Sequence, residues 1–265
     1  MIRSLIFVPA KEKMLSKINT FAADAVIIDL EDSIEINDKK DALIRIKNYL
    51  IANTLKQVVF VRLNSDNFLE EATILSKFKD IGFMLPKFEN TNYYSLCENI
   101  WKAHKVIALI ETPKGLININ SIASCDWVYA VGFGAEDYTC STNMKNSIET
   151  LAFHKNYLIT FCKAYNKLSF DTPSFCLDNY ADFKKEVDNA VSIGFNGKML
   201  IHPKHIDYIN NAFINNDIEY IKNIVEQYEK NDSAISVIDG KIYEKMHINH
   251  FKKLIKENSN YESNR

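Results

Sequence analysis

Two acidic side chains directly follow apolar runs in the middle of the chain, and together they could bind a metal ion. Glu111 ends the segment VIALIE at 106–111, and Asp137 ends VGFGAED at 131–137. A carboxylate at the end of a buried strand is costly to desolvate unless a cation or hydrogen-bond donors pair with it. Two carboxylates with room left for water and substrate suit Mg²⁺, which dehydrates reluctantly. We therefore predict a Mg²⁺ site on Glu111 and Asp137; the alternative is that Glu111 caps the helix beginning at Thr112 and Asp137 forms a turn.

An arginine in an apolar setting is the second candidate for chemistry. The chain has only four arginines among its 32 basic residues, and Arg62 ends the apolar run VVFVR. A guanidinium can bind a carboxylate with two parallel hydrogen bonds, or stabilise the oxygen of an enolate. The alternative is a structural pair with the acids of DLED at 29–32. Those acids could be further metal ligands, but we favour a supporting role in which they hold water, lysine or backbone.

Other reactive side chains are weaker candidates. Lys87 could form an imine with a substrate, but a catalytic amine needs an apolar niche, and a neighbouring metal site makes an imine redundant. We interpret His202 as a structural loop residue rather than a base. Three more histidines are expected on the surface of helices: His104, His154 and His205.

Eight short apolar runs supply the elements that would position these residues. They lie at 4–8, 25–30, 58–63, 82–86, 106–110, 127–133, 168–171 and 197–201. Continuous rather than alternating hydrophobicity is typical of strands covered on both faces, as in parallel sheets. Segments with helical periodicity lie between the runs, at 11–23, 38–52, 67–78, 93–103, 148–165 and 180–193.

This order of elements predicts an α/β fold, a (β/α)8 TIM barrel over residues 1–216. A doubly wound open sheet is the alternative, but the first apolar run has no G-x-G-x-x-G turn after it. A short C-terminal helical extension is expected at 217–257, with a D-G turn signal, and a disordered tail at 258–265. In such a barrel the chemistry lies at the carboxyl ends of the strands, where the candidate residues fall.

Composition narrows the possible partners. The 265 residues are 47% hydrophobic and carry a formal net charge of −2, which gives no electrostatic reason to expect nucleic acid or a membrane surface. The five cysteines have neither C-x-x-C nor metal-finger spacing, so we expect reduced thiols in a cytoplasmic protein. We see no signal-peptide pattern and no apolar stretch near the ~18 residues that a membrane span needs.

Several motifs, taken in order, resemble those of one known family. They are RSLIFVPA, ADAVIIDLEDSI with Asp38-Lys39, VRLN, GFMLPKFE, ALIETPKGL, GFGAEDYT, GFNGKMLIHPKHI and IDGKIYEKM, spread over residues 3–246. In order and spacing they resemble the citrate lyase β-subunit-like family of the HpcH/HpaI aldolase superfamily, which includes malyl-CoA and citramalyl-CoA lyases. Each motif is weak alone, but their order is specific.

The resemblance implies a Mg²⁺-dependent carbon–carbon lyase. It would cleave or form a 3-hydroxy-acyl thioester, with a 2-oxo acid and an acetyl-type thioester as the other reactants. The resemblance places the substrate carboxylate and enolate on Arg62, and the metal on Glu111 and Asp137. It also implies that four weaker positions line the site of the CoA or acyl-carrier thioester: Arg3, Pro9, Lys39 and His202. Two alternatives stay open, namely a metal-dependent aldolase acting on free acids and a subunit of a multi-enzyme lyase.

The C-terminal motif departs from the family pattern. The resemblance places an acid/base aspartate there that reaches into a neighbouring subunit, and the chain has Glu244 at that position and Met246 instead of a proline. Near the N-terminus, Ala10 stands where the family usually has glycine, and Leu43 where it usually has arginine. We expect Glu244 to act as acid/base in a homo-oligomer, a trimer or hexamer.

Overall fold

The computed structural model describes residues 1–213, 218–231 and 234–262. It divides the chain into two compact units, Ile2–Asn210 and a C-terminal unit of Asn211–Arg265 with Met1.

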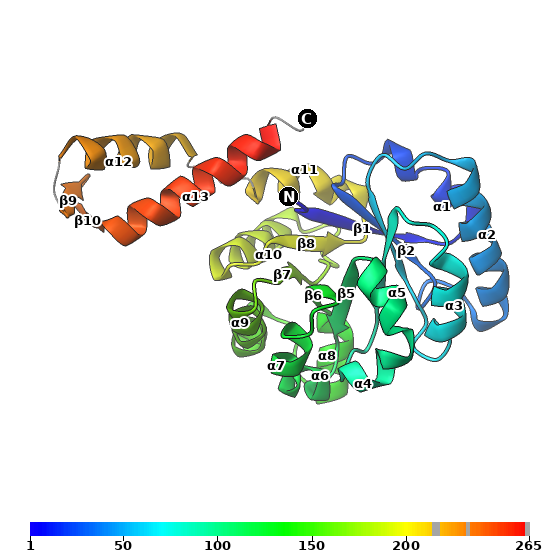
Figure 1. Ribbon diagram of the computed structural model, residues 1–265. Coiled ribbons are helices and arrows are strands. Elements are labelled where there is room, and N and C mark those ends of the chain that lie inside the picture. The colour runs from blue at the N-terminus through cyan, green and yellow to red at the C-terminus, as the bar shows by residue number, and fades with distance from the viewer. Residues whose placement is uncertain (214–217, 232–233, 263–265) are drawn as a thin grey trace. The chain divides into compact units, whose positions relative to one another are not determined.

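The larger unit is a closed barrel of eight parallel strands in sequence order, and the last strand pairs with the first (Figure 1). The strands are β1 (Ser4–Pro9), β2 (Ala25–Asp29), β3 (Val58–Arg62), β4 (Ile81–Leu85), β5 (Val106–Ile110), β6 (Val128–Phe133), β7 (Leu168–Asp171) and β8 (Gly197–Leu200). The predicted (β/α)8 barrel is confirmed, and the open-sheet alternative is wrong. Every residue of β2, β4, β5 and β8 is buried, which explains why these runs are continuously apolar.

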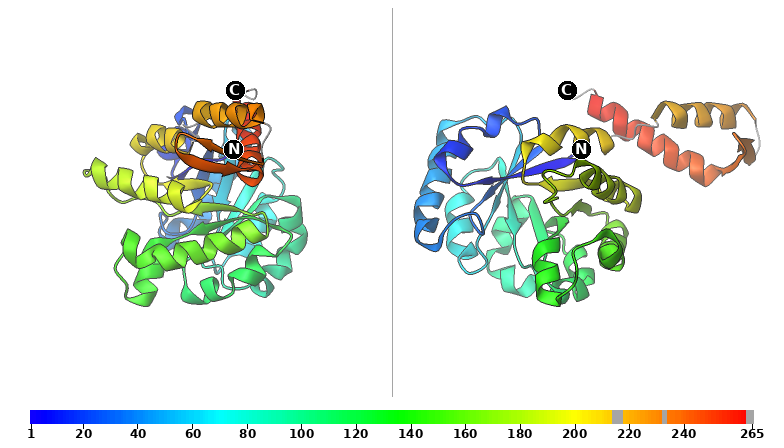
Figure 2. Two further views of the ribbon diagram at one scale, coloured as in Figure 1. Left: turned by 90° about the vertical axis from the view of Figure 1, so that its left-hand side faces the viewer. Right: turned by 180° about the vertical axis from the view of Figure 1, so that it is seen from behind.

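Helices connect the strands and surround the sheet, as two further views show (Figure 2). They are α1 (Glu12–Leu15), α2 (Lys39–Ala52), α3 (Phe68–Leu75), α4 (Thr91–Tyr94), α5 (Glu98–Ala103), α6 (Pro113–Ile117), α7 (Ile119–Ala123), α8 (Ala135–Thr142), α9 (Ile148–Ala164), α10 (Tyr180–Ile193) and α11 (Ile206–Ala212). The helix expected at 93–103 is interrupted by a 3₁₀ turn at Ser95–Cys97. The short α8 was not among the predicted helices, although it carries Asp137.

Local sequence signals set the limits of the longer helices. The side chain of Ser147 accepts a hydrogen bond from the N–H of Thr150 at the start of α9, and Asn179 caps α10 in the same way. Helix α10 ends at Gly194, whose φ of 99° is a left-handed conformation that glycine adopts without strain.

The barrel interior is filled by large apolar side chains from the strands. The cluster contains Leu5, Ile27, Phe60, Met84, Ile107, Leu109, Phe170 and Met199 with smaller neighbours. Leu109 and Met199 also line a cavity at the carboxyl ends of the strands, so the floor of that cavity is part of the core.

The C-terminal unit is a helix pair around a hairpin. It comprises α12 (Ile218–Lys230), β9 (Ile235–Ile238), β10 (Lys241–Glu244) and α13 (Lys245–Glu262). Its own apolar cluster contains Ile224, Val225, Ile238, Tyr243 and Ile248. Asp239 and Gly240 both have positive φ, as a two-residue hairpin turn requires.

The expected boundary between 216 and 217 lies outside the described residues. Helix α13 runs to Glu262, so it includes most of the segment 258–265 that we expected to be disordered; residues 263–265 lie outside the described part. Among the described helices, none is both long and apolar enough to cross a bilayer.

His205 is buried, and the expectation of a surface histidine is wrong for it. Its ring stacks on Phe183 with centroids 3.9 Å apart, and neither ring nitrogen has a hydrogen-bond partner among the described residues. Burial lowers the pKa of His205 to about 4, because the charged ring would have to leave water.

This burial predicts a stability that depends on pH. Between about pH 6.5 and pH 4 the unfolded chain binds a proton on His205 that the folded chain does not, so folding stability falls as pH falls through this window. In His205→Gln the melting temperature should be lower at pH 7, and the gap to the unmodified protein should narrow toward pH 4. The control is His250→Gln at an exposed site of α13, which should leave the pH profile unchanged. Parallel profiles for the unmodified protein and His205→Gln would contradict this account.

Candidate active site

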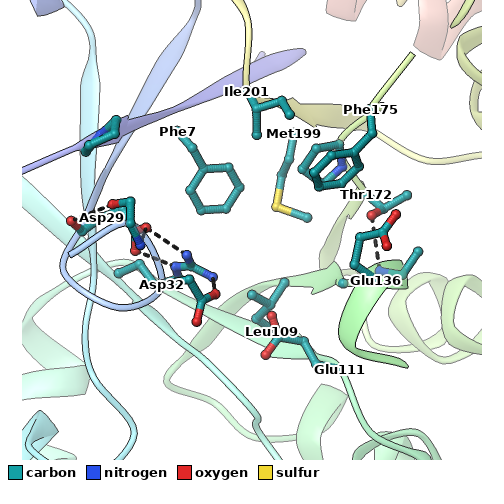
Figure 3. A pocket seen from close by; sticks show the side chains of 16 residues that line it. Phe7, Asp29, Asp32, Leu109, Glu111, Glu136, Thr172, Phe175, Met199 and Ile201 are labelled. Carbon is teal, nitrogen blue, oxygen red and sulfur yellow. Dashed lines mark hydrogen bonds and ion pairs between the residues drawn. The ribbon is translucent and has the colours of Figure 1, made fainter. Parts of the chain in front are cut away.

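A cavity of about 350 Å³ lies at the carboxyl ends of the barrel strands (Figure 3). Its lining is Phe7, Pro9, Asp29, Asp32, Ser33, Arg62, Leu109, Glu111, Gly134, Ala135, Glu136, Thr172, Pro173, Phe175, Met199 and Ile201. Polar residues from the ends of β2, β3 and β5 therefore meet in one place, as the strand order predicts.

Glu111 and Asp29 are the two most deeply buried acids of this cavity. Only 3% of the Glu111 surface is exposed, and Glu111 Oε2 accepts a hydrogen bond of 3.1 Å from the N–H of Lys87. Gly134 packs against it so closely that a Cβ there would lie 2.5 Å from the Glu111 Cγ. Burial raises the pKa of Glu111 to about 8, and the charges of Glu31 and Asp137 add to the rise.

Asp137 lies in the first turn of α8, immediately beyond β6. Two hydrogen bonds fix the start of this helix: the N–H of Gly134 donates to the carbonyl of Ile110 at 2.9 Å, and the N–H of Ala135 donates to the Thr172 hydroxyl at 3.1 Å. The Asp137 side chain is exposed and is not part of the cavity lining. Its charge nevertheless raises the pKa of Glu111, so the two carboxylates lie within electrostatic reach of each other.

These residues fit a bound Mg²⁺ ion. The raised pKa of Glu111 shows a carboxyl group without enough compensating positive charge, which a divalent cation would supply. Among the described residues, no group of three or more His, Cys, Asp or Glu side chains could hold a metal. Mg²⁺ is commonly held by one or two carboxylates, with water and substrate as the remaining ligands. Glu111 and Asp137 would hold the ion, while the neighbouring Glu136 accepts a hydrogen bond from Asn146 at 2.7 Å.

Arg62 lies at the end of β3 and forms the two-pronged contact that its position suggested. Its Nε and Nη2 donate to the two carboxylate oxygens of Asp29 at 2.6 and 2.8 Å. Its Nη1 lies 2.9 Å from Asp32 and 3.3 Å from Glu31. Burial alone would raise the pKa of Asp29, but the hydrogen bonds and charge of Arg62 outweigh burial and hold that pKa below its usual range. The structural pairing that we considered as an alternative is therefore present, and Arg62 also lines the cavity.

Glu31 is a second buried acid beside this arginine. Neither of its carboxylate oxygens has a hydrogen-bond partner among the described residues, although Lys87 Nζ lies 3.4 Å away. Burial raises the pKa of Glu31 to about 7 against the opposing charge of Arg62. Burial lowers the pKa of Lys87, but Glu31 and Asp32 outweigh it, and the net shift is upward. A raised pKa is the opposite of what an imine-forming amine needs.

Three of the weaker candidates lie near the cavity. Pro9 lines it. Lys39 donates to the carbonyls of Leu30 and Glu31 and to Asn64 Oδ1, at 2.8, 2.5 and 2.5 Å, and so ties the loop after β2 to the loop after β3. His202 accepts a hydrogen bond from the N–H of Lys204, which makes it the cap of a 3₁₀ turn. Neither Lys39 nor His202 is part of the lining.

The structure does not bring Arg3 into the cavity. It precedes β1, whose other end is Pro9, so the two residues are separated by the length of the strand, roughly 20 Å. The Arg3 guanidinium is buried, donates to both carboxylate oxygens of Asp24 at 2.8 Å, and also donates to the carbonyl of Asn210. Its observed contacts are structural. Glu244, the last residue of β10, belongs to the C-terminal unit.

One acid at a strand end points away from the cavity. Asp171 ends β7, but its carboxylate is fully buried between Lys155 and Lys198, at 2.7 and 2.6 Å. Burial alone would raise the pKa of Asp171, and the two lysines hold it below its usual range. Asp171 is thus part of the packing between the barrel and its helices.

Sequence reasoning missed the apolar residues of the cavity. They are Phe7, Leu109, Phe175, Met199 and Ile201. A signal was present for two of them, because alternate residues of a strand face the same side. Phe7 lies two positions before Pro9, and Leu109 two before Glu111, so both face the barrel mouth with their polar neighbours.

Comparison with known proteins agrees with this fold and identifies the family of the chain. The sequence profile of the HpcH/HpaI aldolase/citrate lyase family matches residues 3–203. The chain belongs to this family, and the resemblance seen in its motifs is confirmed.

Particular relatives cover nearly the whole chain. Citrate lyase subunit beta of Haemophilus influenzae is 27% identical, with 91% of each chain aligned. A (3S)-malyl-CoA thioesterase of Cereibacter sphaeroides is 25% identical, over 93% of this chain and 90% of the relative. Among solved structures, the CitE protein of Mycobacterium tuberculosis in complex with magnesium, acetoacetate and coenzyme A has a TM-score of 0.82 at 20% identity, covering 97% of this chain and 98% of that one.

Proposed function

We propose that this protein is a Mg²⁺-dependent carbon–carbon lyase that cleaves, or forms, a 3-hydroxy-acyl thioester, with a 2-oxo acid and an acetyl-type thioester as the other reactants. The observation that carries the proposal is the meeting of Glu111 and Arg62 in one cavity, beside the helix turn that bears Asp137. The relatives named citrate lyase subunit beta and the solved relative holding magnesium and coenzyme A support it.

Each residue has a defined role in this proposal. Glu111 and Asp137 would hold Mg²⁺, which when bound would polarise the oxygens of the 2-oxo acid. In the cleavage direction a base takes the proton of the carbinol, whose oxygen becomes the carbonyl of the 2-oxo acid. The carbon–carbon bond breaks, its electron pair moves onto the thioester as an enolate, and the enolate then takes up a proton at carbon to give the acetyl-type thioester. Arg62 faces the oxygen on which this charge develops, where fixed positive charge stabilises the transition state most.

One nitrogen of the Arg62 guanidinium, Nη1, is accessible to a substrate. Asp29 occupies its Nε and Nη2, whereas Nη1 faces Asp32, whose side chain is 57% exposed. An incoming carboxylate or enolate oxygen takes the place of Asp32 at Nη1, while Asp29 keeps the guanidinium in position.

Glu244 of a neighbouring protomer is the proposed acid/base, and the hairpin that carries it offers a surface for assembly. Strand pairing puts Glu244 on the same face of the hairpin as Ile235, Val237 and Ile242. This face is exposed, in contrast to the inward residues Ser236, Ile238 and Tyr243. Adjacent exposed apolar residues are typical of protein interfaces, which supports a homo-oligomer, a trimer or hexamer, whose sites are completed in trans.

The proposal also assigns roles to three weaker site residues and a location in the cell. Pro9 contacts the thioester arm of a CoA or acyl-carrier substrate, and Lys39 and His202 act through the loops that they hold. The location is cytoplasmic, a proposal that the five unpaired cysteines support. Glu244 and Met246, where the family motif has aspartate and proline, favour the second candidate function, an aldolase acting on free acids or within a multi-enzyme lyase.

A calorimetric comparison tests the proposal. The protein is titrated with a 3-hydroxy-acyl-CoA thioester and with the corresponding free hydroxy acid, each in Mg²⁺ and in EDTA, and cleavage products are measured in parallel. We expect Mg²⁺-dependent binding and cleavage of the thioester, with the free acid bound at least ten-fold more weakly. Preference for the free acid would favour the second candidate, and binding unaffected by EDTA would contradict both.

A further inference from the structure

A second cavity, of about 500 Å³, adjoins the one at the barrel mouth. Four residues line both cavities, namely Glu136, Thr172, Pro173 and Phe175. Figure 3 shows Glu136, Thr172 and Phe175 together on one side of the first cavity. The rest of the second lining comes from β8, α9, α10 and the loops before these two helices. We call this space the lysine cavity, after its two buried lysines, Lys155 and Lys198.

The two buried lysines share one carboxylate. Only 7% of Lys155 and 1% of Lys198 is exposed. Their Nζ atoms lie 2.7 and 2.6 Å from the two carboxylate oxygens of the buried Asp171. Each ammonium group has three N–H donors, whereas one carboxylate accepts about four hydrogen bonds, so donors are left for an acceptor in the cavity. The three buried side chains also carry one positive charge in excess.

The pKa of Lys198 reflects this imbalance. Burial and the neighbouring charge of Lys155 lower this pKa, although Asp171 and Glu186 act in the opposite direction. The charged form of Lys198 therefore has too little negative charge around it. An anionic group placed in the cavity would supply that charge.

The more exposed part of the lining carries carboxylates. They come from Glu136, Glu149, Asp182 and Glu186. Glu136 and Asp182 are already bound to neighbouring side chains. Glu186 is half-buried, and the Cys176 thiol, a weak donor, donates to its Oε1 at 3.5 Å. Glu186 can therefore bind a cationic group, and its effect on the pKa of Lys198 places it within electrostatic reach of the buried lysines.

Charges of both signs in one cavity disfavour a simple ion as its ligand. An anion that reaches the two buried lysines would also meet the carboxylates, and a cation that reaches the carboxylates would meet the lysines. A small molecule with one negative and one positive end matches both parts of the lining.

We propose that the lysine cavity binds an α-amino acid as its zwitterion, with the carboxylate on Lys155 and Lys198 and the ammonium group on Glu186. The cavity volume is within the usual range of small-molecule sites, so the side chain of the amino acid has room. Neither Glu111 nor Arg62 lines this cavity, and the proposal does not depend on the reaction proposed above.

A panel of free amino acids tests the proposal. The melting temperature of the full-length protein is measured with each standard L-amino acid, and the one with the largest upward shift is titrated by calorimetry. We expect a dissociation constant below about 10 mM. Two analogues of that amino acid, one without the α-amino group and one without the carboxylate, should each bind at least about ten-fold more weakly, because each loses one charged contact. If no amino acid binds below about 10 mM, or if either analogue binds equally well, the proposal is wrong.

A substitution at the buried end of the cavity locates the ligand. Lys155→Met removes one ammonium group and leaves Asp171 paired with Lys198, so the barrel should still fold. Binding of the amino acid should weaken at least about ten-fold. The matched control is Lys163→Met, at an exposed position of the same helix outside the cavity, which should bind as the unmodified protein does.

Glu186→Gln tests the other end of the ligand, and it also serves if Lys155→Met does not fold. It removes the charge that faces the ammonium group and should weaken binding at least about ten-fold. Asp188→Asn, at an exposed position of α10 outside the cavity, is the control and should leave binding unchanged. Unchanged binding in a folded Lys155→Met or Glu186→Gln variant would place the ligand elsewhere and overturn the proposal.

Discussion

Glu111→Gln and Asp137→Asn are each expected to abolish the thermal stabilisation of the protein by Mg²⁺. An amide is a weaker ligand than a carboxylate and carries no charge, so removing either group leaves too little negative charge to dehydrate Mg²⁺. A ligand at 100 times its dissociation constant stabilises the folded state by about 2.7 kcal/mol. For a domain of this size that corresponds to an upward shift of roughly 5–10 °C, which both variants should lose. Melting curves with and without Mg²⁺ measure the effect.

The matched control for this experiment is Glu136→Gln. Glu136 is next to Asp137, is exposed and lines the cavity, but has no proposed role as a ligand. Its variant should keep the stabilisation by Mg²⁺. A shift that survives in both Glu111→Gln and Asp137→Asn would place the metal elsewhere.

The same variant of Glu111 has a second readout without metal. The pKa of Glu111 is raised to about 8, so between about pH 4.5 and 8 the folded chain retains a proton that the unfolded chain has lost. The metal-free protein should therefore lose stability as pH rises through this window. Glu111→Gln should flatten that decline, because the amide does not titrate.

Arg62→Lys is expected to reduce kcat by at least about 100-fold while the barrel still folds and binds Mg²⁺. Loss of one fixed donor to a developing oxyanion typically costs 10²–10³ in kcat. A lysine ammonium is a single point of charge, so it cannot hold both oxygens of Asp29 and still present a donor to the cavity. Steady-state kinetics in the cleavage direction and the Mg²⁺ melting shift are the two measurements.

The chain offers a matched control for this substitution. Arg45 forms a similar fork with Asp38, at 3.1 and 2.6 Å, but does not line the cavity. Arg45→Lys should leave kcat within about two-fold of the unmodified protein, because loss of one exposed ion pair costs little. Near-normal turnover in Arg62→Lys would remove that residue from the mechanism.

The barrel could be predicted from sequence because its strands are buried on both faces. Runs such as VIALI at 106–110 and AVII at 25–28 are apolar throughout, and each is followed by a polar residue that marks the carboxyl end. Strand order then placed Glu111 and Arg62 at the same edge. The sequence favours a supporting role for the acids of 29–32, and all three of them contact Arg62.

Other features depend on contacts that no local pattern reveals. Arg3 is within a family-like motif, yet it precedes its strand, and its partners are Asp24 and Asn210, the latter over 200 residues away in sequence. His205 has a surface-like helical spacing but stacks on Phe183. The apolar lining of the active-site cavity combines residues of β1, β5, β8 and two loops, so only the closed barrel brings it together.

The most direct test of the central claim is a crystal structure of the protein grown with Mg²⁺ and pyruvate. We predict one ion at the carboxyl ends of β5 and β6, with a carboxylate oxygen of Glu111 and one of Asp137 each about 2.1 Å from it, and with the oxo acid completing the coordination. An ion bound elsewhere, or carboxylates of Glu111 and Asp137 too far apart to share it, would contradict the account.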